Sequence, residues 1–372
     1  MKPCLIIFDI DETLYDNHLK QIPASTLTAI DKLKKAGHTL AVATGRSLFE
    51  LIPQVKDLPF DFFILANGQL AIKNNEIIYD EAIDPEIVKE LMAEANRVGT
   101  HLGFNSATHS SVTGLTPQMQ EAFEKYYTTM PEVSSCIKKH GAIYQMWYLS
   151  EDITHISEKF KDRLRFLPWL NNGADVVPVG ASKAMGLTKT LEILGTSLPE
   201  EIIFFGDGIN DIELVEMASI GVAMGNAVPA LKAVADYITT DITENGIYHG
   251  CDILGLFTAN QTDSDIDDQI VKLEANIATG VCMLDDYFHL KTLYSSYKKQ
   301  PYQSLQHLKK ALTNYPHEVS LLLEMATFYE FELENVTKAK MYYEQVLKIN
   351  PDHLLAKNAL NIINKYGYLT NG

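Results

Sequence analysis

The chain has 372 residues, 46% of them hydrophobic, which is enough to bury one large core or two to three smaller ones. Its 48 acidic and 31 basic residues give a formal charge of −17. This balance argues against a nucleic-acid-binding or anionic-membrane surface, because both need clustered Lys and Arg. No stretch approaches the roughly 20 apolar residues of a membrane span. The first residues show no signal-peptide core and the cysteines are far apart, so we expect a soluble cytoplasmic protein with reduced thiols.

The first 80 residues alternate short apolar runs with helical patterns. The apolar runs are CLIIFDI, HTLAVAT and DFFILAN, and the helical patterns between them are ASTLTAIDKLKKAG and SLFELIPQV. Strands separated by crossover helices predict a parallel, doubly wound sheet that binds ligands at the carboxyl ends of its strands. Asp9, Thr44 and Asn67 each follow an apolar run, so we expect them at that edge.

The same alternation returns in residues 181–257, for example in SKAMGLTKTLEILG and EEIIFFGDGIND. The intervening residues 81–180 have more aromatic, Thr, Ser and His residues, and GAIYQMWYLS is typical of an antiparallel strand. We therefore predict an α/β core formed by residues 1–80 and 181–257, with a second domain inserted over residues 81–180.

After Leu256 the apolar strands stop and only helical periodicity remains. Residues 258–283 begin polar and acidic, as a linker or a helix start would. In residues 284–372, the segments SLQHLKKALTNYP and AKMYYEQVLKINP begin at Ser304 and Ala339, 35 positions apart by subtraction. That offset is close to the tetratricopeptide period of about 34, although an independent stack needs about three repeats. The tail either packs on the core, forms a dimer or offers a groove to a peptide partner.

An acidic cluster directly follows the first predicted strand, in IIFDIDETLYD; its carboxylates are Asp9, Asp11, Glu12 and Asp16. Adjacent carboxylates repel one another and are costly when buried without a partner, so we expect a cation or a reacting centre here. If the chain turns, one of Asp9 and Asp11 can stay ionised as nucleophile and metal ligand. The other, with a raised pKa, can serve as general acid and base. Thr13 would cap the turn or orient a neighbour. A solvated acidic loop is the alternative for this stretch taken alone.

A later apolar run also ends in carboxylates, in FFGDGINDIELVEMA. Asp207 and Asp211 lie four positions apart, and Asp211 falls near a predicted helix start beside Asn210. Oxygen ligands of this kind suit Mg²⁺, which completes its octahedron with water and substrate phosphate. The competing interpretation is a dinucleotide-binding glycine pattern, which fails because Asp211 occupies the position of its third glycine.

Two further segments suit a phosphoryl group. AVATGRS places Thr44, Gly45 and Arg46 at the end of the second strand, where a hydroxyl and the N–H groups of a helix start would bind an anion. An ordinary N-cap is the alternative there. VGASKAMGL places Lys183 at a helix start, where a cation opposes the helix dipole. Balancing Asp9 and a phosphoryl group would explain this lysine, and a solvated surface position is the default alternative.

Taken in this order, FDIDETL, ATGRS, Lys183 and GDGINDIEL resemble the four motifs of the haloacid dehalogenase superfamily, specifically its Cof-like phosphatases. The resemblance covers residues 4–256 and includes GVAMGNAVPALKAVADYITTDITENGI. It implies an α/β fold with a Rossmann-like parallel-sheet core and an inserted α/β cap of the C2 type over residues 81–180. Residues 258–372 are additional to that pattern, and we expect them to form an all-α repeat extension.

The resemblance implies a phosphoric monoester hydrolase, in which Asp9 attacks phosphorus and becomes an aspartyl phosphate. Asp11 then protonates the leaving oxygen and later activates water. Thr44 holds a phosphoryl oxygen, and Lys183 offsets the charge of Asp9 and the phosphate. Such chemistry depends mostly on positioning and on charge neutralisation.

By the same resemblance, Mg²⁺ is bound by Asp9, the Asp11 carbonyl and Asp207. Four further residues support the metal and the phosphate: Asn210, Asp211, Gly45 and Arg46. Asn67 and Gly68, in NGQLA, face the substrate, and the inner face of the cap selects the leaving group. The cap candidates for that selection are Phe104, Asn105, Tyr144 and Trp147.

The expected substrate is a small phosphorylated metabolite, with a sugar phosphate favoured over a nucleotide or pyridoxal phosphate. Neither a nucleic acid nor a membrane is expected as a partner. The alternative function is an interaction protein whose helical tail recruits a partner or self-associates. In that case the phosphatase core is targeted to a phosphoprotein or serves as a scaffold. The clustered carboxylates favour the enzyme, because a scaffold has no physical need for them.

Overall fold

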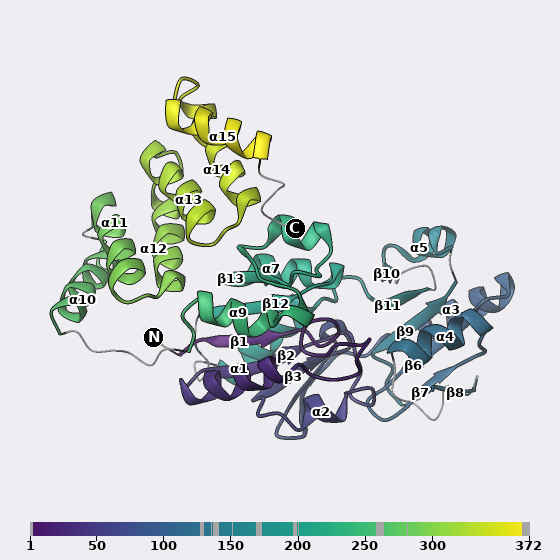
Figure 1. Cartoon of the computed structure of the whole chain (residues 1–372). Coiled ribbons are helices and arrows are strands. Elements are labelled where there is room, and N and C mark those ends of the chain that lie inside the picture. Colours follow the sequence, from purple (N-terminus) through teal and green to yellow (C-terminus); the bar gives the residue numbers. More distant parts are fainter. Residues whose placement is uncertain are drawn as a thin grey trace.

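The computed structural model describes residues 3–366, apart from short gaps at 127–129, 135, 137–140, 151, 169–172, 196–198, 200, 258–263 and 281. The first residues of the predicted 258–283 segment and the last residues of the predicted 284–372 segment therefore lie outside the described residues. Figure 1 shows a central layered body, a smaller sheet with its own helices, and a stack of helices from the C-terminal part of the chain.

Within the described residues, the central sheet has eight strands in the order β14-β13-β12-β1-β2-β3-β4-β5 (Figure 1). They are β1 (Leu5–Phe8), β2 (Thr39–Ala43), β3 (Phe62–Leu65), β4 (Leu70–Lys73), β5 (Glu76–Asp80), β12 (Ile202–Gly206), β13 (Ile220–Ala223) and β14 (Tyr237–Ile238). The four residues of β1 are all buried, as a central parallel strand requires. The predicted parallel sheet is confirmed from β14 to β3, whereas β4 and β5 add an antiparallel hairpin at one edge.

The helices and turns of the core are α1 (Ala24–Lys35), α2 (Pro53–Lys56), η1 (Ala66–Gly68), α6 (Lys183–Leu194), η4 (Ile209–Asp211), α7 (Ile212–Met217), α8 (Pro229–Val234), η5 (Ile242–Glu244) and α9 (Gly246–Ile253). The helix predicted over SLFELIPQV was wrong for most of that segment, because only α2 is helical there. Pro53 is tolerated only in a first helical turn and disfavours helical backbone in the residue before it. Residues 47–52 contain only a bend and a turn, so no helix starts directly after Arg46.

The second sheet lies between β5 and α6 in chain order and, in its described residues, has the strand order β10-β11-β9-β6-β7-β8. Its elements are α3 (Pro85–Val98), β6 (His101–Asn105), β7 (Ser110–Val112), α4 (Pro117–Tyr126), β8 (Glu132–Val133), β9 (Gln145–Leu149), α5 (Thr154–Phe160), β10 (Leu164–Pro168) and β11 (Ala174–Pro178). β9 pairs antiparallel with both β6 and β11, which confirms the strand predicted from GAIYQMWYLS. We call this part the cap.

The remaining helices form the tail: α10 (Ser264–Ala278), α11 (Leu284–Thr292), the π-helical turn η6 (Leu293–Tyr297), α12 (Pro301–Asn314), α13 (Val319–Phe331), α14 (Val336–Ile349) and α15 (Leu354–Tyr366). The pair α12–α13 is followed by the pair α14–α15, and corresponding helices start 35 residues apart, at Pro301 and Val336 and at Val319 and Leu354. The all-helical C-terminal extension is therefore confirmed. Its buried apolar side chains belong to the same cluster as those of the central sheet.

None of the helices in the described part of the chain combines the length and the apolar character needed to cross a bilayer.

Candidate active site

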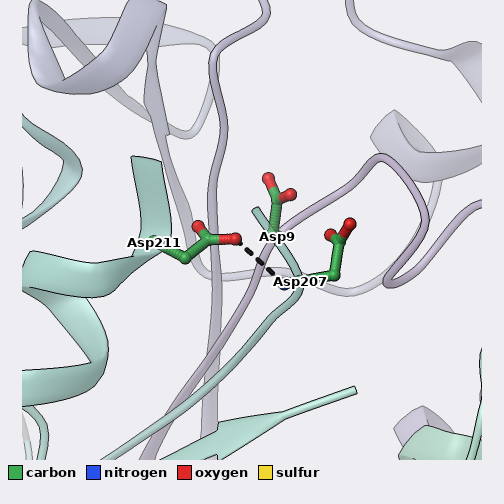
Figure 2. Close-up of side chains that lie close together, drawn as sticks. All are labelled: Asp9, Asp207 and Asp211. Carbon is green, nitrogen blue, oxygen red and sulfur yellow. Dashed lines mark hydrogen bonds between the residues drawn. The ribbon is translucent and has the colours of Figure 1, made fainter. Parts of the chain in front are cut away.

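Three carboxylates meet at the carboxyl edge of the central sheet. Asp9 directly follows β1 and Asp207 directly follows the neighbouring parallel strand β12, so strand pairing alone brings them side by side. Asp211 ends η4 at the start of α7. One oxygen from each residue can be chosen so that all three lie within 4.8 Å of one another. Figure 2 shows the three side chains gathered at this point.

Lys183 links two of these carboxylates from inside the protein. It is the first residue of α6 and its side chain is fully buried. Its Nζ donates to Asp9 Oδ1 at 2.7 Å and to Asp211 Oδ1 at 2.6 Å. Burial opposes its charge, but the two carboxylates outweigh burial and raise the pKa of Lys183 above its ordinary value. The lysine is thus a fixed positive charge beside Asp9, and the surface alternative does not apply.

Asp211 is committed to holding this arrangement. Its Oδ2 accepts a hydrogen bond from the backbone N–H of Asp207 at 3.0 Å (Figure 2). The same oxygen accepts a second from the N–H of Gly208 at 2.9 Å. A Cβ on Gly206 would lie 2.6 Å from the same oxygen, so only glycine lets the strand end approach this carboxylate. With its other oxygen on Lys183, Asp211 fixes both the loop and the lysine.

Asp207 is oriented by the first loop. Thr13, which is fully buried, donates from Oγ1 to Asp207 Oδ1 at 2.9 Å. The predicted role of Thr13 in orienting a neighbour is therefore confirmed. The turn that allows this contact includes Glu12, which has a left-handed φ of 57°.

The site carries an excess of negative charge. Burial, opposed by Lys183 and reinforced by the carboxylates of Asp211 and Asp11, raises the pKa of Asp9 to about 7. Burial and the charge of Asp9 also raise the pKa of Asp207 well above its ordinary value. All the donors are hard oxygens, and these residues offer only one buried cation for several carboxylates. This set of oxygens fits a divalent cation such as Mg²⁺.

Asp11 lies in a different environment from the one predicted for a general acid. Its carboxylate accepts from Arg46 Nε at 2.9 Å, from Arg46 Nη2 at 2.6 Å and from Asn17 Nδ2 at 2.9 Å. Burial alone would raise its pKa, but the charge and hydrogen bonds of Arg46 outweigh burial and lower it. The sequence left open which of the two aspartates has the raised pKa, and in this conformation it is Asp9, whereas the pKa of Asp11 is lowered.

The Thr44 loop is tied to the neighbouring η1 turn. Thr44 Oγ1 accepts from the backbone N–H of Arg46 at 3.1 Å, and the Thr44 carbonyl accepts from the N–H of Asn67 at 3.0 Å. A Cβ on Gly45 would lie 3.2 Å from Asn67 Nδ2, so glycine suits this contact. Thr44 hence caps a turn rather than a helix.

Asn67 connects three parts of the chain: its own η1 turn, the η4 turn that contains Asn210, and the cap. Its Oδ1 accepts from Asn210 Nδ2 at 2.9 Å, and its Nδ2 donates to Gln145 Oε1 at 3.1 Å and to Asp175 Oδ2 at 3.2 Å. The adjacent Gly68 has a φ of 97°, and a Cβ there would lie 2.0 Å from the Ser182 carbonyl oxygen. This close approach seats the start of α6 against η1.

The cap residues beside Asn67 differ from those predicted. Phe104 and Trp147 are fully buried in the apolar clusters of the cap, Asn105 is fully buried between them, and Tyr144 donates to Asp80 Oδ2 at 2.9 Å. Two described cap residues that do contact Asn67 are Gln145 and Asp175, which no motif indicated. The available signal was a polar side chain within an otherwise apolar strand, in YQMWYL and ADVVPV.

The comparisons with known proteins agree with this geometry. A family model described as haloacid dehalogenase-like hydrolase matches residues 6–250. A Bacillus subtilis protein named "Putative phosphatase YkrA" is 34% identical over 254 residues, covering 68% of this chain and 98% of that protein. The 5-amino-6-(5-phospho-D-ribitylamino)uracil phosphatase YitU of the same bacterium is 26% identical, with 66% of this chain and 95% of that protein covered.

Among solved structures, the HAD subclass IIB sugar phosphatase BT4131 matches with a TM-score of 0.62 at 30% identity. The match covers 68% of this chain and 99% of that chain. A protein from Geobacillus kaustophilus HTA426 matches with a TM-score of 0.61 at 33% identity, with 68% and 99% covered. Because the family model matches more than half of this chain, the chain belongs to the haloacid dehalogenase-like hydrolases and is a phosphatase.

Proposed function

We propose that this phosphatase is Mg²⁺-dependent and hydrolyses a small phosphorylated metabolite, with a sugar phosphate as the preferred substrate, through an aspartyl phosphate on Asp9. The observation that carries the proposal is the buried Lys183, which donates to both Asp9 and Asp211. A cation fixed beside one carboxylate favours the ionised form of that carboxylate and offsets the charge that a phosphate brings. When bound by Asp9, the Asp11 carbonyl and Asp207, Mg²⁺ supplies further charge stabilisation at the phosphoryl oxygens.

In the first step, an oxygen of Asp9 forms a bond to phosphorus while the bond between phosphorus and the leaving oxygen breaks. Asp11 donates its proton to that oxygen, and Thr44 holds a phosphoryl oxygen. In the second step, a water molecule gives a proton to Asp11 and attacks phosphorus, which releases inorganic phosphate and the Asp9 carboxylate. Asp11 must exchange its contacts with Arg46 and Asn17 for the leaving oxygen in this scheme.

A sugar phosphate is supported by the polar seam between core and cap. Asn67, Gln145 and Asp175 offer both donors and acceptors, as the hydroxyl groups of a sugar require. The structurally similar BT4131 is named as a sugar phosphatase, whereas YitU is named for a ribityl-aminouracil phosphate. The alternative of an interaction protein with an inactive core is not favoured, because the buried carboxylates and Lys183 are assembled as catalysis needs them.

The test is phosphate release from a panel of sugar phosphates, nucleotides and pyridoxal phosphate, with Mg²⁺ and with a chelator. The matched variants are Asp9→Asn at the nucleophile and Asp31→Asn on an exposed helix surface. We expect release that requires Mg²⁺ and Asp9, loss of about three orders of magnitude or more in Asp9→Asn, and no change in Asp31→Asn. Equal activity of Asp9→Asn and the wild type would contradict the nucleophile assignment.

The aspartyl phosphate and the cation can each be tested without turnover. In Asp11→Asn both steps lack Asp11, so the substrate for this test is an aryl phosphate, whose leaving group needs no proton in the first step. The second step still lacks its base, and we expect a phosphorylated peptide containing Asp9 to accumulate and to be detected by mass spectrometry. Mg²⁺ should raise the melting temperature of the wild type but not that of Asp207→Asn. A substrate ranking led by nucleotides would leave the phosphatase assignment intact and correct the substrate class.

A further inference from the structure

One carboxylate of the core, Asp236, is buried beneath the tail although it belongs to no part of the active site. Asp236 directly precedes β14, and its side chain is 8% exposed. Within the core, its Oδ2 accepts from the backbone N–H of Gly221 in β13 at 2.9 Å. One backbone hydrogen bond does not balance a buried carboxylate, so the remaining partners decide whether this residue is tolerated.

Those partners come from the tail. Lys309 of α12 donates from Nζ to Asp236 Oδ2 at 2.7 Å, and Tyr329 of α13 donates from its hydroxyl to Oδ1 at 3.0 Å. Lys338 of α14 places its Nζ 3.9 Å from Oδ1. Asn335, which precedes α14, donates from Nδ2 to the Asp236 backbone carbonyl at 3.1 Å. Three successive helices of the tail and the turn before the third therefore converge on one residue of the core.

The tail groups are held in place within the tail itself. Asn335 Oδ1 accepts from the backbone N–H of Lys338 at 3.0 Å and so caps α14, which leaves its Nδ2 directed at the core. Tyr329 is fully buried, and its ring stacks on Tyr342 of α14 at 5.6 Å between centroids. Because the four groups come from three successive helices, α12, α13 and α14 with its N-cap, the site exists only when the tail is stacked.

The charges make the site selective for a carboxylate. Burial lowers the pKa of Lys338, and the nearby Lys309 acts in the same direction, whereas Asp236 and, to a smaller extent, Glu216 oppose both. Without an anion, two lysines would face each other in a half-buried position at a cost in free energy. The tail offers two cations and a hydroxyl, which fit a carboxylate, and an amide N–H, which fits a backbone carbonyl. Asp236 presents both of these acceptors.

We propose that the helical tail carries a carboxylate-binding site formed by Lys309, Tyr329, Asn335 and Lys338, and that the core fills this site in cis with Asp236. The tail is then fixed in one position on the core by a specific polar contact in addition to apolar packing. An acidic segment of another protein can use these four groups only by displacing Asp236. A partner that does not displace Asp236 would have to bind another surface of the tail.

The experiment is hydrogen exchange followed by mass spectrometry on the full chain, with peptides from residues 219–238 of the core and 301–349 of the tail. The variants are Asp236→Asn, which removes the charge with little change in shape, and Lys309→Met, which removes the cation from the tail. Asp31→Asn is the matched control, because its carboxylate pairs only with the exposed Lys35 among the contacts described. Phosphate release is measured in parallel to show that the core stays folded.

We expect exchange in both sets of peptides to accelerate by at least about tenfold in Asp236→Asn and in Lys309→Met, and to be unchanged in Asp31→Asn. The double variant should be no faster than the faster single variant, because both changes remove the same contact. Tyr329→Phe, which removes only the hydroxyl, should show a smaller acceleration in the same peptides. Unchanged exchange in Asp236→Asn, or strictly additive effects in the double variant, would overturn the proposal and leave the tail attached by apolar packing and by other hydrogen bonds such as that of Tyr302 with Glu201.

Discussion

The cap and the tail are both joined to the central sheet, but they are joined by different kinds of contact. In its described residues the cap has two apolar clusters of its own, one around Phe104 and one around Trp147, whereas its Tyr144 belongs to the cluster of the core. Its contacts with the core across the seam include polar pairs such as Asn67 with Asp175 and Arg165 with Glu213. The tail instead shares one continuous apolar cluster with the central sheet.

This difference indicates which of the two parts can separate from the core. Polar contacts at a seam can be exchanged for water or substrate at little net cost, whereas separating a shared apolar core exposes its whole surface to water. We therefore expect the cap to separate from the core during turnover and the tail to remain attached. Both tryptophans, Trp147 and Trp169, lie within residues 81–180, so tryptophan fluorescence follows the cap. Circular dichroism follows the helix-rich core and tail.

The largest expected effect comes from removing a side chain from the shared cluster. Tyr302 of α12 is fully buried and donates to Glu201 of the core at 3.0 Å. Tyr302→Ala should lower the free energy of unfolding of core and tail by about 3–5 kcal/mol, because it leaves a cavity in a core that both share. Urea unfolding followed by circular dichroism should show the shift, with little change in the fluorescence transition.

The matched variant in the cap is Phe160→Ala, at a buried residue of α5. It should shift the fluorescence transition by a similar amount and leave the circular dichroism transition nearly unchanged. Coincident shifts of both signals in both variants would show that cap, core and tail unfold as one unit, and the comparison would fail.

The next effect is a pH dependence at the junction of core and tail. His38 Nδ1 accepts from the backbone N–H of Cys4 at 3.1 Å, and its Nε2 lies 2.9 Å from the Leu256 carbonyl oxygen, so these partners fit a neutral ring protonated at Nε2. Burial lowers the pKa of His38 below the ordinary 6.5. Below pH 6.5 the unfolded chain gains a proton at His38 that the folded chain does not. The contribution of neutral His38 to the free energy of unfolding is therefore fully present above that pH and falls as the pH decreases.

Urea midpoints by circular dichroism at about pH 8 and about pH 5.5 should therefore differ more in the wild type than in His38→Gln. A loss of packing in the variant lowers its urea midpoint at both pH values, whereas loss of the titrating group changes how steeply the midpoint depends on pH. A wild type and a variant with the same slope would show that another group causes the pH dependence.

A smaller effect is expected from the ion pair between cap and core. Arg165 of β10 donates from Nη1 to Glu213 Oε1 of α7 at 2.5 Å, and both side chains are partly exposed. Glu213→Gln should weaken the closed position of the cap by about 0.2–1 kcal/mol, so KM for the best substrate should rise less than tenfold while kcat changes little. Glu192→Gln, at an exposed pair within the core, is the control and should change neither constant.

The smallest expected effect is a pH dependence confined to the cap. Hydrogen bonds from Arg97, then from Lys159, lower the pKa of Glu94 from 4.5 to about 2 and join α3 to α5. The contribution of these hydrogen bonds to the stability of the cap is fully present above pH 4.5 and is lost as the pH falls from 4.5 to about 2. The fluorescence transition of the cap should weaken over this range in the wild type and less steeply in Glu94→Gln. An equal loss in both would assign the acid sensitivity elsewhere.

Much of the core site could be predicted from the sequence because it depends on short stretches. An apolar run followed by Asp9 predicts a strand end, and parallel neighbours place Asp9 and Asp207 side by side whatever the rest of the chain does. Lys183 at a helix start was anomalous as a surface residue, and the structure places it between two carboxylates. These signals use only the sequence near each residue.

The contacts that escaped prediction join residues far apart in the chain. Asn67 meets Asp175 across 108 positions, and Asp236 meets Lys309 across 73. The pairing of Arg46 with Asp11 spans 35 positions and lowers the pKa of Asp11. No periodicity or spacing encodes such pairs, because they depend on how distant segments of the core, the cap and the tail pack together.

The sequence by itself determined the strands, the carboxylates at their ends, the inserted cap and the 35-residue helical repeat, since each follows from local periodicity and from the chemistry of a few neighbouring residues. Only the tertiary structure decided which carboxylate has the raised pKa, which cap residues face Asn67 and where the tail is attached. Those outcomes depend on burial and on charge pairs formed between distant segments, and both arise only once the chain is folded.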